Sequence, residues 1–268
     1  METTAKDIVR QIVVISATVY MLIGAIVGSG LLGGTPVQDL QGGALAADGS
    51  FLAPASPAFS IWSAIYLLLI VYAVWQAFPA QAARERQRAI GWWIAATAVL
   101  NGTWLVLAQF TTLALTVIGI VVLLAALCIT FVQTIRFPSE GVADRLLIDG
   151  ATGLHLGWVS LATVANVSAW LTAIGPDSWA DFAGLWGVII LVVVGVIGVA
   201  IAWASGWRIA PGLALAWGLS WLAVGRLQGE PPSTAIGVTA IIVAVIVLAV
   251  PLLGGLLHRV IEVRNAEV

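Results

Sequence analysis

The stretch DRLLIDGATGLHLGWVSLATVANVSAW, residues 144–170, decides the fold of this chain. After Arg145 it runs for about 25 residues with one carboxylate near its start, long enough for a helix to cross the ~30 Å hydrocarbon core of a bilayer. The same stretch carries polar side chains, among them His155 and Asn166, that a helix surrounded by lipid would avoid. Because polar side chains at membrane depth normally face other helices or a cavity, the stretch predicts a helix inside a bundle.

The composition places the whole chain in a membrane. Of its 268 residues, 61% are hydrophobic and 9% are charged, whereas a soluble domain carries about 25% charged residues. We therefore expect an all-α, polytopic membrane protein, located in the cytoplasmic (inner) membrane of a bacterium. Membrane lipid is an expected partner. The chain has a net charge of −2 and no basic patch, so we do not expect it to bind nucleic acid.

Eight apolar segments predict eight transmembrane helices with both termini in the cytoplasm. They are residues 11–32, 57–78, 91–110, 112–134, 147–170, 182–204, 209–227 and 235–257. With the N-terminus inside, Arg226 alone among the basic residues lies outside, and this bias sets the orientation of a membrane protein. The ten that lie inside are Lys6, Arg10, Arg84, Arg86, Arg88, Arg136, Arg145, Arg208, Arg259 and Arg264.

Three predicted helices bring aromatic and amide side chains to one depth, in the half of the membrane away from the cytoplasm. Trp158, Ala162 and Asn166 share one helix face, because their spacing is i, i+4, i+8. A rise of ~1.5 Å per residue brings residues of the second and third spans to a similar level. These residues are Trp62, Tyr66, Asn101 and Trp104. Such a group predicts an apolar pocket with a few orienting polar groups, suited to a flat, apolar ligand.

Signatures of catalysis are scarce, so we expect a binding protein more than an enzyme, with no required cofactor or metal. There is no phosphate loop, no serine-nucleophile motif and no pair of deep carboxylates. His155, the one histidine within a span, could ligate haem, relay protons or pack against a neighbouring helix. Asp149 is expected to pair with Arg145 at spacing i, i+4, and Cys128 to be a buried small apolar residue. A retinal Schiff base is excluded, because Lys6 is the only lysine.

Several motifs resemble those of the TspO/MBR family, the tryptophan-rich sensory proteins related to the mitochondrial translocator protein. WSAIY at residues 62–66, after the loop with Pro54 and Pro57, resembles the family's proline-rich approach to W-x-x-x-Y. LNGTW at residues 100–104 is similar to L-N-x-x-W, and GWVSLATVAN at residues 157–166 to A-W-V-S-F-A-T-x-L-N. The resemblance covers about residues 8–172.

The resemblance implies a five-helix bundle, residues 1–174, that binds porphyrin, haem or another flat apolar ligand and forms a homodimer. The pocket would be closed by the loop of residues 33–56 and lined by the motif residues Trp62, Tyr66, Asn101, Trp104, Trp158 and Ala162. His155 stands where the family usually has tyrosine, and the end of this span lacks the residues of the family's proposed cholesterol motif. Residues 175–268 would add a three-helix transmembrane segment, a candidate lateral partner that replaces or alters the dimer contact.

Three functions remain open at this point. The first is a sensory or regulatory protein that binds a tetrapyrrole. The second is a transporter of porphyrins or other small apolar solutes, although the spans show no inverted repeat and no pair of broken helices. The third is an intramembrane enzyme that degrades porphyrin with light. A pocket around Trp217 and Trp221 is an alternative location for the ligand.

Overall fold

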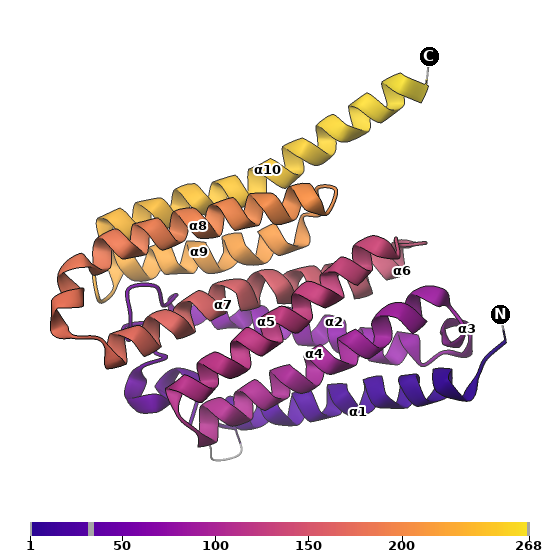
Figure 1. The fold of residues 1–268 in the computed structure, drawn as a ribbon, viewed down its shortest axis with the longest axis horizontal. Helices are drawn as coiled ribbons and strands as arrows, with labels where there is room; N and C mark the ends of the chain where they lie inside the picture. Colours follow the sequence, from indigo (N-terminus) through magenta and orange to yellow (C-terminus); the bar gives the residue numbers. More distant parts are fainter. Residues whose placement is uncertain (1, 32–34, 267–268) are drawn as a thin grey trace.

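The computed structural model describes residues 2–31 and 35–266, which form long helices that run back and forth between two ends of a bundle (Figure 1). Its all-helical, polytopic architecture confirms the predicted fold class. The long helices are α1 (Ala5–Gly28), α2 (Ile61–Gln76), α4 (Glu85–Phe110), α5 (Leu113–Arg136), α7 (Ala151–Ile174), α8 (Ala183–Ala204), α9 (Ala210–Gln228) and α10 (Thr234–Ala266). Shorter helical pieces in the links are η1 (Val37–Asp39), η2 (Gln41–Gly43), η3 (Ser56–Ser60), α3 (Pro79–Ala82), α6 (Val142–Asp144), η4 (Arg145–Gly150) and η5 (Asp177–Phe182).

The long helices lie close to the eight predicted spans, and α9 differs from the others in composition. Within the part of the chain that the structure describes, seven helices are long and apolar enough to cross a membrane. α9 has 19 residues but is not one of these seven, because Arg226 and Gln228 lower its mean hydropathy. It packs against α7, α8 and α10, and a helix covered by other helices needs a less apolar surface than one that faces lipid.

The buried apolar side chains form two clusters. The larger cluster joins α1, α2, α4, α5 and α7, and the smaller one joins α8, α9 and α10, which lie together on one side of the molecule (Figure 1). The clusters meet at the α7–α9 contact, since Leu161 of α7 belongs to the smaller cluster and Ala214 of α9 to the larger. The division into segments 1–174 and 175–268 stays a prediction.

Glycines allow α7 and α9 to approach each other closely. A Cβ atom on Gly157 would overlap the backbone carbonyl of Pro211 and lie 3.0 Å from the Cβ atom of Ala214. A Cβ atom on Gly218 would overlap the side chain of Leu161 and come within 3.3 Å of the Trp158 ring. Small residues at a helix contact let two backbones come together, as is common between membrane helices. α7 therefore connects the larger cluster, to which it belongs, with α9.

A network of ion pairs closes one end of the bundle, which we call the arginine-rich end. Asp149 forms ion pairs with Arg86 and with Arg208, whose Nη1 atom lies 3.3 Å from its Oδ1 atom. The predicted pair of Asp149 with Arg145 is wrong. Arg145 instead donates to Ser139 (Nε to Oγ, 3.3 Å). The cause is local, because residues 145–150 form a π-helix, whose wider turn moves residues i and i+4 out of register.

The two ends of the chain, α1's start and α10's end, lie toward the arginine-rich end (Figure 1). The opposite end, which we call the loop end, carries the described part of the predicted 33–56 loop, residues 35–56; residues 33 and 34 lie outside the described residues. The cytoplasmic location of the termini stays a prediction. Cys128 is exposed on α5, so its expected burial is wrong. The reason is that it lies on the face of α5 that turns away from the neighbouring helices.

Candidate ligand pocket

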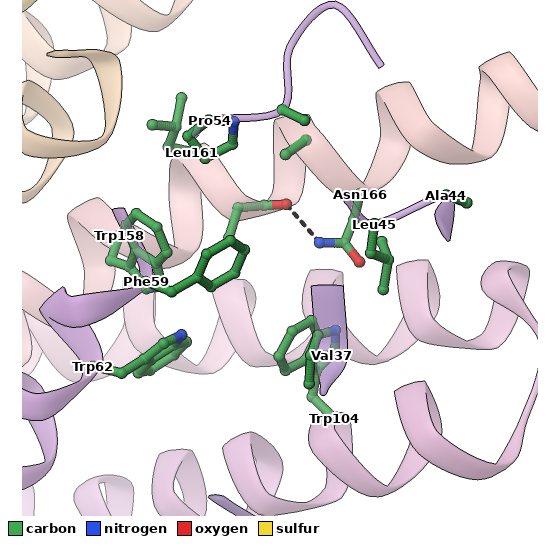
Figure 2. A pocket seen from close by; sticks show the side chains of 13 residues that line it. Val37, Ala44, Leu45, Pro54, Phe59, Trp62, Trp104, Trp158, Leu161 and Asn166 are labelled. Atoms are coloured by element: carbon green, nitrogen blue, oxygen red, sulfur yellow. Dashed lines mark hydrogen bonds between the residues drawn. The ribbon is translucent and has the colours of Figure 1, made fainter. Parts of the chain in front are cut away.

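A pocket lies at the loop end, between α2, α4, α7 and the loop that connects α1 to α2 (Figure 2). Five of the residues predicted as its lining face it, and the loop adds several more. The predicted ones are Trp62, Trp104, Trp158, Ala162 and Asn166. The others are Val37, Ala44, Leu45, Ala53, Pro54, Phe59, Leu161 and Ala165. The shared face of α7 that the i, i+4, i+8 spacing predicts is thus one wall of this pocket.

Aromatic rings form one end of the pocket. The rings of Phe59 and Trp158 meet edge to face with centroids 5.8 Å apart, and Trp62 meets Trp158 in the same way at 6.1 Å. Figure 2 shows these three rings gathered at one end and Trp104 with Val37 at the other. Such rings present flat apolar surfaces, and edge-to-face pairs keep their relative positions well defined.

Tyr66, Asn101 and His155 lie behind this lining and do not face the pocket. Tyr66 stacks on Trp62 with centroids 5.1 Å apart, and its hydroxyl donates to the Oδ1 atom of Asn101 at 3.2 Å. The imidazole of His155, 1% exposed, meets Trp62 edge to face at 5.7 Å. These three residues therefore support the Trp62 ring from behind. Each lies one turn nearer the arginine-rich end than a lining residue of its own helix, namely Trp62, Trp104 or Trp158, so the pocket ends at a shallower level than the sequence predicted.

Three polar atoms on the lining have no hydrogen-bond partner among the described residues. They are the indole nitrogens of Trp104 and Trp158 and the Oδ1 atom of Asn166. The Nδ2 atom of Asn166 donates to the backbone carbonyl of Ala162 at 2.8 Å, the dashed line in Figure 2. Most buried polar groups in proteins are paired, so two free donors and one free acceptor on these residues leave hydrogen-bonding capacity beside an apolar wall.

The pocket is narrow. Its cavity has a volume of about 40 Å³, room for a few water molecules, whereas pockets for drug-sized ligands measure ~300–1,000 Å³. The whole empty space of the site, open solvent at its mouth included, is about 550 Å³, so the enclosed cavity is only a small part of it. A ligand larger than a few atoms therefore requires the lining to move.

The loop residues are the part of the lining that the motifs did not identify. Val37 comes from η1, Ala44 and Leu45 follow η2, and Ala53 and Pro54 precede η3. The sequence signal for them was indirect, namely a long loop rich in glycine, alanine and proline beside the aromatic helices. We call residues 44–58 the lid, because this segment covers the pocket at the loop end.

The alternative pocket around Trp217 and Trp221 and the question of a metal site concern residues outside this lining. Trp217 and Trp221 lie on α9, where their rings meet edge to face at 5.8 Å, and neither lines the pocket. Among residues 2–31 and 35–266, no three side chains of His, Cys, Asp or Glu come together as a metal site would require.

Comparison with known proteins identifies the family but gives no individual relative. No curated protein and no solved structure matches the chain. The sequence pattern of the TSPO-like protein family matches residues 12–253. This match runs across the predicted boundary at residue 174 and includes α8, α9 and most of α10, whereas the motifs discussed above end within α7. The chain therefore belongs to the TSPO-like protein family and is an integral membrane protein.

Proposed function

We propose that this protein binds a flat, apolar ligand of the tetrapyrrole class in the pocket at the loop end and acts as a sensory or regulatory membrane protein. The observation that carries the proposal is the convergence of Trp62, Trp104 and Trp158, from three helices, on one apolar pocket. Aromatic faces stack well on a planar conjugated ring, with a gain beyond simple area burial.

The unpaired polar atoms define the chemistry that a ligand should offer. The indole N–H groups of Trp104 and Trp158 can each donate a hydrogen bond, and the Oδ1 atom of Asn166 can accept one. A buried polar group without a partner costs ~1–3 kcal/mol. A tetrapyrrole carries pyrrole N–H donors together with nitrogen and carboxylate acceptors, so it has atoms of both kinds for these groups.

The small cavity implies that binding is coupled to movement of the lid. A tetrapyrrole exceeds the 40 Å³ cavity many times over, and α4 and α7 are held by extensive helix packing. The lid has little regular structure apart from the three-residue turn at Ser56–Ala58 that begins η3, and such segments open at lower free energy than packed helices. We therefore expect the lid to move aside when the ligand binds.

Quenching of tryptophan fluorescence by protoporphyrin IX, in the dark and in detergent, tests this proposal. The variant carries Trp158→Phe together with Ala162→Phe, which fills the α7 wall of the pocket. Its matched control carries Ala200→Phe with Trp203→Phe, two exposed positions on α8. Saturable quenching that the control keeps and the pocket variant loses would support the proposal. No saturable quenching by the unmodified protein would overturn it.

The same titration separates binding from transport and from degradation. A regulatory binding protein leaves the porphyrin absorbance unchanged, in the dark or in light. Loss of porphyrin absorbance in light that depends on Trp158 would identify a degrading enzyme. Uptake of porphyrin into sealed vesicles that contain the protein, at a rate that the pocket variant lowers, would identify a transporter.

A further inference from the structure

We propose that α9 holds the lid of the pocket closed, with Arg226 as the positioning residue, so that the last three helices control how fast a ligand enters and leaves. The part of this inference that concerns ligand entry and exit rests on the proposed function. The contact between α9 and the lid is a separate observation and can be tested without a ligand.

Arg226 is directed at the backbone of the lid. Its side chain lies in the interior, 1% exposed. Its guanidinium donates to the carbonyls of Ala47 (2.6 Å) and Ser50 (3.2 Å) in the lid, and to the carbonyl of Glu230 (2.8 Å) after α9. The ion pairs among the described residues do not include Arg226.

A buried guanidinium is stable only when it is well hydrogen-bonded, since removing a charge from water is costly. Bonds from a charged donor are also stronger than those between neutral groups. Two of the three bonds that Arg226 makes end on the lid. When the lid opens, these two bonds break and the guanidinium loses partners. Arg226 therefore stabilises the closed position specifically.

The contact continues along one face of α9. The backbone carbonyl of Trp221 accepts a hydrogen bond from the amide of Ala55 at 3.1 Å. One turn earlier, the indole of Trp217 donates to the carbonyl of Ala58 at 2.9 Å. Residues at this i, i+4 spacing lie on one side of a helix. Together with Arg226 they bind the lid from Ala47 to Ala58.

Close packing strengthens this attachment. A Cβ atom on Gly225 would lie 3.4 Å from the amide nitrogen of Ala55, so the backbone of the lid rests directly on α9. Leu52, 2% exposed, is buried in the smaller cluster with side chains of α8, α9 and α10. The neighbouring Ala53 and Pro54 line the pocket. The lid is thus a single layer of chain between the ligand pocket and the last three helices.

The test measures lid opening and porphyrin kinetics separately on the full chain. The main variant, Arg226→Met, keeps a long side chain but removes its hydrogen bonds; Arg226→Lys restores part of them. The control is Arg259→Met, an exposed position on α10. We expect amide hydrogen exchange of residues 44–58 to rise about 10-fold in Arg226→Met, less in Arg226→Lys, and not in the control, while α4 and α5 keep their protection.

The association and dissociation rates of protoporphyrin IX should both rise about 10-fold in Arg226→Met, with a smaller change in affinity. Trp217→Phe, which removes one lid bond and keeps the ring, should raise lid exchange by a few-fold. Unchanged lid exchange in both folded variants would overturn the proposal, and so would a general rise across all helices. Faster lid exchange in a protein that binds no porphyrin would reject the proposed function and support the role of α9.

Discussion

The hydroxyl of Tyr66 donates a 3.2 Å hydrogen bond to the Oδ1 atom of Asn101, and this bond joins α2 to α4 behind the pocket. Asn101 is fully buried, and its Nδ2 atom has no partner among the residues that the structure describes. Among the described residues, the bond from Tyr66 is therefore the one side-chain hydrogen bond of this buried amide.

Tyr66→Phe should lower the free energy of unfolding by ~1–3 kcal/mol, the cost of leaving a buried polar group unpaired. Thermal unfolding in detergent measures this change. Tyr20→Phe is the matched control, because Tyr20 also bonds α4, through Thr103 at 3.3 Å, but on an exposed surface. Its effect should stay within ~0.5 kcal/mol. Equal effects for the two variants would show that Tyr66 does not support Asn101.

Gly157→Ala should separate α7 from α9. The new Cβ atom would overlap the carbonyl of Pro211, a backbone group that cannot rotate away, so we expect a loss of ~1–3 kcal/mol of stability. Thermal unfolding is again the measurement. Gly184→Ala on α8 is the control, because nothing lies within 4 Å of its Cβ position. This control should be neutral or slightly stabilising, since alanine favours helices more than glycine does.

Asn166→Leu should raise stability and weaken ligand binding at the same time. The substitution removes an acceptor, Oδ1, that has no partner within the described part of the protein, and this should increase the free energy of unfolding by up to ~1–3 kcal/mol. If the ligand donates a hydrogen bond to Asn166, its affinity should fall ~2–10-fold, the net value of one such bond. Unfolding curves and the porphyrin titration give the two values. A stabilised variant with unchanged affinity would show that the ligand does not use Asn166.

Asp149→Asn should strongly destabilise the arginine-rich end. Asp149 is the carboxylate that pairs with both Arg86 and Arg208, and removing one member of a buried ion pair costs ~3–5 kcal/mol. Glu140→Gln is the control, because Glu140 is 68% exposed where it pairs with Arg84; exposed pairs contribute ~0–1 kcal/mol. Similar losses for both variants would contradict the network described here.

Both termini should lie in the cytoplasm. The bias of Lys and Arg toward the arginine-rich end predicts this orientation. Reporter fusions at the two ends of the chain, one fluorescent only in the cytoplasm and one active only outside it, measure the location. A reporter active outside the cytoplasm at either end would reject the predicted topology.

Local sequence properties determined the helices and which site residues share a helix face. Length and hydropathy are properties of one segment at a time, which is why the predicted spans 112–134 and 182–204 nearly coincide with α5 and α8. Helical spacing is equally local, so it was enough to place Trp158, Ala162 and Asn166 on one wall of the pocket.

The tertiary structure decided which side chains meet across helices. Trp62 and Tyr66 share one face of α2 at spacing i, i+4, but only Trp62 lines the pocket, and Tyr66 stacks one turn deeper and bonds Asn101 of α4. The level at which the pocket ends follows from packing between helices, which no single segment contains. In the same way, the π-helix at residues 145–150 places Asp149 beside Arg86 and Arg208 and not beside Arg145.

The path of the lid depended most on the tertiary structure. Its bonds to α9 join residues far apart in the chain, such as Ala47 and Arg226. From the sequence, Arg226 was only the one basic residue outside the positive-inside pattern. The fold gives the reason for its position, because a buried guanidinium must find hydrogen-bond acceptors, and here the backbone carbonyls of the lid provide them.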